Sequence, residues 1–337
     1  MKKFLWLLSF LLIFGCGNYE GFTIDPTPDS EIQEYPLNLS WGDIDTNNDG
    51  VRENYITPIK KQPCKDCYIY AALGLLEIQY QIDFKTYLDL DLSEQSIHNC
   101  LKISCSDTGD DRTILEHVRK YGVMEESYAP TGTWGTCNNC LPFLFGSGTG
   151  ITTVEHIPFF SFRSWRTITY KKDDPDDMRR AIVKALQTGP VSIHISGWSG
   201  LKREGDILYC SEWNPGGHVV VVVGYRYHGK VLLIKNSHGE AGLLRLVFEN
   251  ADICGIGDNS IAQISPGSTY ATWGLGEQFC YSMEDSDKDG VPNAHDNCPS
   301  VENVDQKNAD GDMFGDVCDK CPNDFDRTNN FYCAPKN

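Results

Sequence analysis

The chain has 337 residues and a formal net charge of -18, with 29 Lys and Arg against 47 Asp and Glu. Such an acidic balance argues against a nucleic acid as partner. The length is sufficient for one domain with a large hydrophobic core and smaller appendages.

The N-terminus has the form of an export signal. Two lysines precede an apolar run at 4–14, which is too short to cross a bilayer that needs about 20 residues. The run ends at Ile13-Phe14-Gly15-Cys16, which resembles the bacterial lipobox, and the resemblance implies that Cys16 carries a lipid. A plain secretory signal with an incidental cysteine is the alternative. Gly17 replaces the Asp linked with inner-membrane retention, so we expect an exported protein anchored to the outer membrane or cell surface.

We therefore expect a signal peptide at 1–15. Residues 16–34 are polar, contain two prolines and offer little to bury, which is typical of a tether. Fourteen cysteines in an exported chain indicate an oxidising compartment, where thiols pair unless chemistry keeps them free. If Cys16 carries lipid and Cys67 stays free, the other cysteines are even in number.

Apolar periodicity predicts helices in the first half and strands in the second half of the segment from Tyr35 to Pro266. The run 67–84 is rich in Tyr, Ile, Ala and Leu without proline, which indicates a buried helix with Asp66 as a possible N-cap. Amphipathic helices are expected at 112–121 and 176–186, and strands at 191–195, 219–223, 231–234 and 243–247. This pattern predicts an α+β fold with two lobes.

Three chemistry-bearing residues occur in an order typical of a cysteine nucleophile. Cys67 begins the buried helix, His218 precedes a run of five valines, and Asn236 follows a predicted strand. A thiol at neutral pH needs a base to take its proton, and the base needs a third group to orient it. Each residue alone has an ordinary interpretation, as half of a disulfide, a strand-end histidine or a turn residue. The ordered set favours catalysis.

Several fragments in the same order resemble the papain-type cysteine peptidases, over roughly Leu37 to Ile264. The resemblance implies a domain at 35–266 with a helical lobe and an antiparallel, barrel-like β lobe, and hydrolysis of peptide bonds through a thioester without a catalytic cofactor. The matching fragments are Leu37-Asn-Leu-Ser-Trp41, Ile56-Thr-Pro-Ile-Lys60, Gln62-Pro-Cys64-Lys-Asp-Cys67-Tyr68, Leu92-Ser-Glu-Gln95, Gly189-Pro-Val-Ser192, Gly217-His218, Ile234-Lys-Asn236-Ser237 and Cys254-Gly-Ile256.

The family mechanism implies a role for each matched residue. Cys67 is the nucleophile, with a thiol pKa lowered by the helix dipole and an adjacent imidazolium. His218 accepts the thiol proton and later donates it to the leaving amine, and the amide oxygen of Asn236 orients the ring. Gln62 and the backbone N–H of Cys67 stabilise the oxyanion.

Departures from the family pattern leave other readings open. Gln62 lies five residues before Cys67 where the family has six, and Lys61 occupies the family's position. His238 replaces a tryptophan that shields the His-Asn contact. A binding or adhesion lipoprotein with a degenerate peptidase domain is therefore one alternative, and a transpeptidase or ligase that uses the same thioester is another. The acidic segment 106–111 replaces a glycine pair, which favours substrates with basic side chains.

The resemblance also implies disulfides. By position Cys64 pairs with Cys105, Cys100 with Cys137 or Cys140, and Cys210 with Cys254. Cys280 and the remaining member of the 137/140 pair are left over and can pair with each other.

The C-terminal tail has a separate pattern. After a linker at 267–283, residues 284–326 hold thirteen Asp and Glu against three Lys and resemble thrombospondin type 3 repeats, with Cys298 and Cys318 as disulfide candidates and a tail at 327–337. The resemblance implies structural Ca²⁺, which binds several oxygen ligands. A disordered acidic tail is the alternative. The segment 45–50 also has the start of a calcium loop, although Ile56 stands at the twelfth position. The expected calcium ligands are Asp285, Asp287, Asp289, Asn293, Asp296, Asn308, Asp310, Asp312, Asp316 and Asp319.

Overall fold

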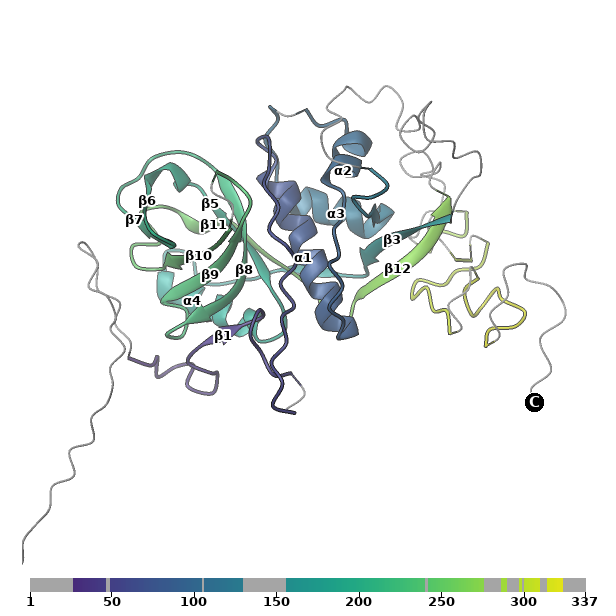
Figure 1. Ribbon diagram of the computed structural model, residues 1–337, viewed down its shortest axis with the longest axis horizontal. Coiled ribbons are helices and arrows are strands. Elements are labelled where there is room, and N and C mark those ends of the chain that lie inside the picture. The colour runs from purple at the N-terminus through teal and green to yellow at the C-terminus, as the bar shows by residue number, and fades with distance from the viewer. Residues whose placement is uncertain are drawn as a thin grey trace, which may run out of the picture.

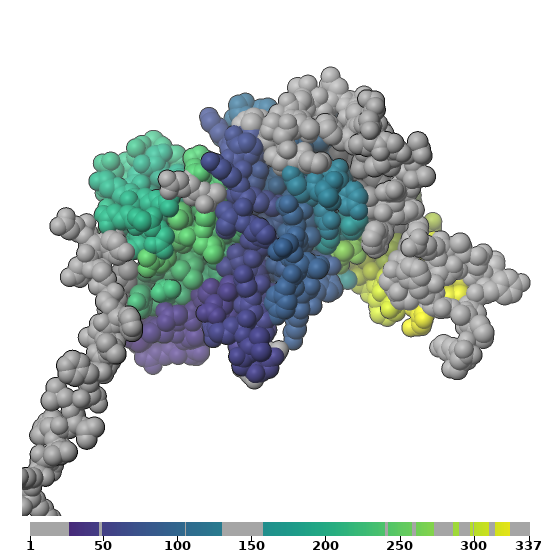
Figure 2. Space-filling view, in the orientation of Figure 1, coloured from purple at the N-terminus to yellow at the C-terminus, as the bar shows by residue number. Residues whose placement is uncertain are grey.

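The structure is a computed structural model that describes residues 27–46, 49–104, 106–129, 156–239, 242–275, 286–289, 297–298, 300–309 and 314–323. Figure 1 shows a β-sheet lobe beside a helical lobe, with helix α1 (Cys67–Phe84) between them. This is the expected α+β arrangement of two lobes. In the space-filling view of Figure 2, the dark-blue chain around α1 separates the green sheet lobe from the blue helical lobe.

Helix α1 is buried along nearly its whole length because it is apolar on all sides. It packs against strands of the sheet lobe on one side and against the other helices of its own lobe on the other. The helical lobe also contains α2 (Glu94–Leu101), α3 (Asp111–Tyr121) and a three-stranded sheet of β2 (Val123–Met124), β3 (His156–Phe162) and β12 (Thr269–Leu275).

The second lobe is built on a nine-stranded sheet in the order β4-β11-β5-β8-β9-β10-β7-β6, with β1 pairing with β8. Its strand pairs are antiparallel except β10 with β7. Its elements are β1 (Leu39–Ser40), β4 (Trp165–Thr167), α4 (Pro175–Leu186), β5 (Val191–Ile195), the short 3₁₀ helix η2 (Trp198–Gly200), β6 (Leu201–Glu204), β7 (Ile207–Cys210), β8 (His218–Arg226), β9 (Val231–Asn236), β10 (Gly242–Val247) and β11 (Ile256–Ile264).

Strand β8 joins the two hydrophobic cores because its side chains alternate between the faces of the sheet. Val219, Val221 and Val223 pack with α1, whereas Val220 and Val222 pack in the core beside α4. The run of valines is therefore buried on both faces. This placement fixes the first residue of β8, His218, next to the helical lobe.

Two predicted boundaries are wrong. The expected linker at 267–283 begins with β12, whose residues pair with β3 from Thr269 to Leu275, so the folded domain extends past residue 266. The expected tether at 16–34 ends in ordered chain: Ile32 is 6% exposed within the second core, and Asp29 pairs with Arg179. Apolar and charged contacts with the sheet lobe hold this segment, which composition alone does not reveal.

Candidate active site

Cys67 is the first residue of α1 and has a free thiol. Asp66 precedes it at the N-cap position, but its side chain makes no capping hydrogen bond, contrary to the sequence prediction. The carboxylate instead contacts the His98 imidazole of α2, with Oδ2 3.0 Å from Nε2. The helix start is therefore tied to a neighbouring helix by its Asp66 side chain.

His218 and Asn236 lie on the adjacent strands β8 and β9, at the first residue of one and the last of the other. The Nε2 atom of His218 is 2.8 Å from Oδ1 of Asn236. Since an amide oxygen only accepts, Nε2 carries the proton in this contact, and in the neutral ring Nδ1 keeps a lone pair. Both residues are buried, at 3% and 2% exposed.

The amide of Asn236 is itself oriented by the backbone of His238. Its Nδ2 donates to the His238 carbonyl at 2.8 Å, and its Oδ1 accepts from the His238 N–H at 3.3 Å. These contacts determine which end of the amide faces the imidazole. The orientation therefore depends on the main chain of residue 238 and does not require a particular side chain there.

The thiol of Cys67 lies beside the start of β8. The backbone N–H groups of Val219 and Tyr68 donate to its sulfur. Because Val219 directly follows His218 in the chain, this contact places the Cys67 thiol near His218. The structure thus brings Cys67, His218 and Asn236 together from α1, β8 and β9.

Burial acts on the ionisation of both members of this pair. Burial raises the pKa of the Cys67 thiol above its ordinary value and the carboxylates of Asp66 and Asp111 raise it further, against the effect of the two N–H donors. Burial lowers the pKa of His218 to about 4, with further lowering by His238 and His194. In the substrate-free site, burial therefore disfavours the charged form of both groups.

Gln62 lies at the same site despite its shifted spacing. Its backbone N–H donates to the Ser237 carbonyl at 2.9 Å, and its side-chain Oε1 accepts from the Ser237 hydroxyl at 2.8 Å. Its Nε2 donates one proton to the Cys64 carbonyl at 2.6 Å, which leaves the second N–H of the amide. Gln62, rather than Lys61, therefore joins the loop before Cys67 to the residue after Asn236.

An aromatic cover over His218 comes from a residue that the sequence did not single out. The Trp198 ring of η2 lies 4.3 Å from the His218 ring, centre to centre, at an angle of 56°. The exposed His238 ring is farther, at 5.5 Å. An isolated Trp in a Ser-Gly-Trp-Ser-Gly segment carries no sequence signal for this role. The contact depends on how η2 folds back over β8.

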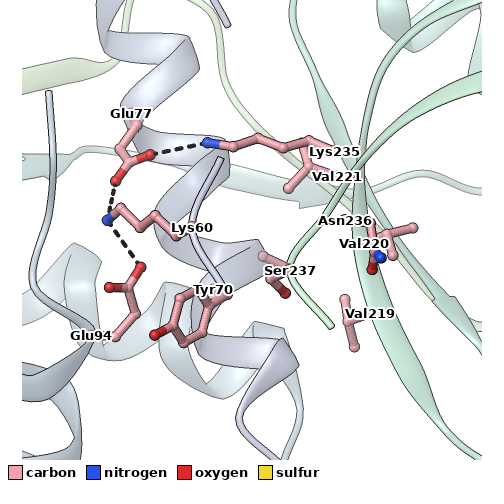
Figure 3. A pocket seen from close by; sticks show the side chains of 11 residues that line it. Lys60, Tyr70, Glu77, Glu94, Val219, Val220, Val221, Lys235, Asn236 and Ser237 are labelled. Carbon is pink, nitrogen blue, oxygen red and sulfur yellow. Dashed lines mark hydrogen bonds and ion pairs between the residues drawn. The ribbon is translucent and has the colours of Figure 1, made fainter. Parts of the chain in front are cut away.

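Beneath the site, a buried ion-pair network joins the two lobes, as Figure 3 shows. Lys60 lies 2.7 Å from Glu77 of α1 and 3.0 Å from Glu94 of α2. Lys235 reaches from β9 to the same Glu77 at 3.4 Å. Because Lys235 immediately precedes Asn236, the network fixes the strand end that carries the orienting amide.

The structure shows two disulfides with both partners described. Cys210 and Cys254 are joined, as the resemblance implied. Cys298 and Cys318 are joined in the C-terminal segment. Cys64 and Cys100 are also disulfide-bonded, whereas Cys105, Cys137, Cys140 and Cys280 lie outside the described residues.

Five of the ten expected calcium ligands lie outside the described residues: Asp285, Asn293, Asp296, Asp310 and Asp312. Among the others, Asp289 accepts the N–H of Asn303 at 2.9 Å and Asp316 pairs with Lys307 at 2.8 Å. The Oδ2 of Asp287 is buried and has no hydrogen-bond partner within the described chain. A buried carboxylate oxygen without a hydrogen-bond partner fits a hard cation such as Ca²⁺ as ligand.

A further acidic group occurs in the segment that begins like a calcium loop. Carboxylate oxygens of Asp45, Asp49 and Glu53 lie within 4.8 Å of one another. Glu53 stands at the ninth position of this loop, whereas the sequence argument looked for an acid at the twelfth. N–H groups of the loop donate to these carboxylates, including Gly50 to Asp45 at 3.1 Å and Thr46 to Glu53 at 2.9 Å. The loop is thus closed by its own hydrogen bonds.

The predicted signal peptide and Cys16 lie outside the described residues. Within the described ranges, the structure contains no helix with the length and apolar character needed to span a membrane.

Comparison with known proteins places this geometry in a family. A family model described as papain family cysteine protease matches residues 43–264. The viral cathepsin of Spodoptera exigua nuclear polyhedrosis virus (strain US) is 28% identical over 235 residues, which cover 66% of this chain and 60% of that protein. The senescence-specific cysteine protease SAG12 of Arabidopsis thaliana is 27% identical over 242 residues, covering 65% of this chain and 62% of that protein.

The chain spans 60% to 65% of the length of the first three viral cathepsins that it matches. Among solved structures, bromelain protease from Ananas comosus in complex with the E64 inhibitor is 19% identical with a TM-score of 0.46, covering 68% of this chain and 99% of that one. A structure on the limited antibody cross reactivity between the mite allergens Blo t 1 and Der p 1 is 21% identical with a TM-score of 0.49. The match covers 71% of this chain and 74% of that one. The family-model match covers most of the folded domain, and the chain belongs to the papain family of cysteine proteases.

Proposed function

We propose that the protein is a cysteine endopeptidase that hydrolyses peptide bonds through a thioester on Cys67. The observation that carries this proposal is that α1, β8 and β9 each contribute one residue to the same site. A free thiol at the start of α1 lies beside His218, whose ring is oriented by Asn236 at 2.8 Å. This is the nucleophile, base and orienting group that thiol acyl transfer needs.

In this mechanism the neutral Nδ1 of His218 takes the Cys67 proton as sulfur attacks the peptide carbonyl. The carbonyl oxygen becomes an oxyanion, which the remaining N–H of Gln62 and the backbone N–H of Cys67 stabilise. His218 then gives its proton to the leaving amine, and the acyl group stays on sulfur as a thioester. Water, deprotonated by His218, hydrolyses the thioester and restores the thiol.

The burial of the His-Asn contact favours activity over a degenerate binding domain. The sequence raised that alternative because His238 replaces a shielding tryptophan. Asn236 is nevertheless only 2% exposed, and Trp198 covers His218. A dry contact keeps the imidazole tautomer fixed, which the mechanism requires.

The test is labelling of the full chain in mild detergent with a peptidyl epoxide, followed by mass spectrometry of the modified residue. We expect rapid labelling of Cys67 that Cys67→Ala removes and that His218→Ala slows at least tenfold. A folded protein whose Cys67 reacts no faster than a free thiol contradicts the proposal. Product analysis with an added amine nucleophile separates hydrolysis from peptide ligation by the same thioester.

We further propose that the enzyme is exported and held at a membrane by a lipid on Cys16, with a Ca²⁺-stabilised C-terminal segment. The lipobox-like sequence and the alternating carboxylates of 284–326 support these two proposals. Metabolic labelling with a fatty acid tests the first, and we expect Cys16→Ser to abolish it. Lipid incorporation that survives this substitution overturns the anchor at this position.

A further inference from the structure

We propose that His98 is a positioning residue for the nucleophile: by pairing with Asp66 it fixes the start of α1 and supplies a proton that cancels the negative charge beside Cys67. The proposal rests on the proposed role of Cys67 as nucleophile. It concerns a second carboxylate–imidazole pair, separate from His218 and Asn236, on residues that the mechanism above does not use.

The pair is fully buried. Asp66 is 1% exposed and His98 is 3% exposed, with Oδ2 and Nε2 3.0 Å apart. The other ring nitrogen of His98, Nδ1, lies 3.2 Å from the carbonyl oxygen of Ile103. The second carboxylate oxygen of Asp66, Oδ1, is buried and accepts no hydrogen bond within the described chain.

These contacts determine the number of protons in the pair. A carbonyl oxygen only accepts, so Nδ1 of His98 carries a proton toward Ile103. The contact of Nε2 with a carboxylate oxygen also needs a proton, since two lone pairs facing each other at 3.0 Å repel. Whether that second proton belongs to the ring or to the carboxyl, the pair as a whole is neutral. A bare, buried Oδ1 is also tolerated far better in a neutral pair than in an isolated carboxylate.

The location makes this neutrality relevant to the chemistry. Asp66 directly precedes Cys67, and its carbonyl accepts the N–H of Ile69 at 2.8 Å in the first turn of α1. An isolated negative charge there opposes formation of the thiolate. His98 comes from α2, so its bond to Asp66 also ties the start of α1, which carries the nucleophile, to a second helix.

Other ionisable groups face this region. The negative charge of Asp111, which accepts from the buried Ser192 hydroxyl, disfavours the thiolate of Cys67, and so would the Asp66 carboxylate without the proton of its partner His98. His218 directly precedes Val219, whose backbone N–H donates to the sulfur. Tyr68 and Tyr70 of α1 lie within the field of Asp66, and Asp107 lies within that of His98. The Asp66 carboxylate is bonded to the His98 imidazole, so a change in the charge of this pair can be tested by substituting these two residues.

The test is a double-mutant cycle on the full chain, measured as the rate of iodoacetamide alkylation of Cys67 from pH 4 to 10. His98→Gln keeps an amide donor toward Asp66 but brings no extra proton, so the apparent thiol pKa should rise by about one unit, which is about tenfold slower alkylation at pH 7. Asp66→Asn leaves a neutral amide beside a neutral ring and should shift that pKa by less than about half a unit. The double variant should return to the wild-type profile, because no uncompensated charge remains.

The outcomes separate charge from packing. A rise in His98→Gln that persists in the double variant, or no rise at all, overturns the proposal. A fall of about one unit in Asp66→Asn also overturns it, since the wild-type pair then carries a net charge. If His98→Gln does not fold, His98→Asn, a smaller neutral amide, takes its place in the cycle. Loss of epoxide labelling in the wild type is a failure of the proposed function, whereas these shifts are measured with a small alkylating reagent that any accessible thiol reacts with.

Discussion

At the scale of single residues, the cover over His218 shows how one substitution is compensated by another part of the chain. His238 occupies the position where the resemblance predicts a tryptophan, and it is exposed. Trp198, some twenty residues before His218 in sequence, lies over the imidazole instead. The cover needs only a flat apolar ring that excludes water from the hydrogen bond between His218 and Asn236. Any loop that reaches the imidazole of His218 can supply such a ring.

We predict that Trp198→Ala lowers kcat/KM for a peptide substrate by about 10- to 100-fold, because the imidazole loses the cover that holds its orientation. Trp198→Phe keeps a ring at the same place and should retain most of the activity. Melting temperatures measured for both variants control for misfolding. Equal losses in the two variants would mean that the indole is needed for something other than covering His218.

How far single residues could be predicted from the sequence depends on the origin of their contacts. Cys67, His218 and Asn236 follow from motif order, since each stands at the end of an element that periodicity locates. The distance between Gln62 and Cys67 was ambiguous because a loop can lose a residue without moving its ends. The link from Asp66 to His98 was not visible, because a side chain before a helix looks like a cap until a competing partner is placed in space.

At the scale of elements, the network of Lys60, Glu77 and Lys235 holds α1 against β9. Glu77 is 1% exposed and faces two ammonium groups, at 2.7 Å and 3.4 Å. Burial opposes ionisation of Glu77, but Lys60 and Lys235 outweigh it and lower the pKa of Glu77. The pair with Lys235 crosses between the lobes, directly behind Asn236.

We predict that Lys235→Met destabilises the protein by about 3 kcal/mol. This value is at the lower end of the usual cost of removing one partner of a buried ion pair, because Lys60 still faces Glu77. Urea unfolding in a Cys67→Ala background, which prevents self-digestion, measures this change. The double variant with Glu77→Gln should recover part of the loss, since it removes the unbalanced charge. A cost below about 1 kcal/mol for the single variant would place the energy of the lobe contact elsewhere.

Glu94 shares Lys60 with Glu77 and Asp91, so the cluster has more carboxylates than ammonium groups. Burial raises the pKa of Glu94 to about 7, against the pull of Lys60. A raised folded-state pKa means that the folded protein keeps a proton that the unfolded chain releases. The contribution of Glu94 to stability is therefore complete below pH 4.5, its ordinary value, and is lost as pH rises to about 7.

We predict that Glu94→Gln makes the unfolding free energy less sensitive to pH across this window. The advantage of the variant over the wild type should grow with pH by up to about 1.4 kcal/mol per unit and become constant above pH 7. Urea unfolding at pH 5, 6, 7 and 8 in the Cys67→Ala background gives the comparison, with Glu116→Gln, an exposed surface change, as control. Parallel curves for Glu94→Gln and wild type would show that Glu94 is ionised throughout.

The helices and strands with strong periodicity were predictable, because a buried helix such as 67–84 or a valine run such as 219–223 carries its pattern in a few consecutive residues. The strands outside these runs were missed: β1, β2, β3, β4, β6, β7, β11 and β12. Several are short, and none has a run of β-branched or aliphatic residues bounded by turn residues that the sequence analysis recognised, so their pairing depends on partners placed by the fold. Residues 269–275, for example, form β12 only because β3 provides an edge to pair with.

At the scale of the whole molecule, the chain before the domain is partly built into it. The Asp29 carboxylate contacts Arg179, and its N–H donates to Nδ1 of His228 at 3.0 Å. Removal of residues 1–34 should therefore lower the melting temperature by several degrees relative to removal of residues 1–26, because only the longer deletion takes away these contacts and Ile32. Differential scanning calorimetry of the two deletions compares them. Identical melting temperatures would restore the tether assignment up to residue 34.

The C-terminal segment depends on a different source of stability. It buries few apolar side chains in the described part, where Cys298 and Cys321 are the buried hydrophobic residues, and its shape relies on a disulfide and on polar side chains that bond to backbone. Carboxylates that crowd together without apolar burial repel one another unless a cation is shared between them. The buried and unpartnered Oδ2 of Asp287 is one place where such a cation gains an oxygen ligand.

We predict that excess EGTA makes residues 284–326 sensitive to an added protease while the domain before them stays intact, because the domain has its own core. Limited proteolysis with mass spectrometry of the fragments locates the cuts, and added Ca²⁺ should reverse the effect where Mg²⁺ does not, since Mg²⁺ sheds its water reluctantly. Asp287→Asn should require more Ca²⁺ for protection. Cleavage that is unchanged by EGTA would leave the disulfides as the sole support of this segment. Epoxide labelling of Cys67 in the same samples should be unaffected, because its contacts all lie within the two lobes.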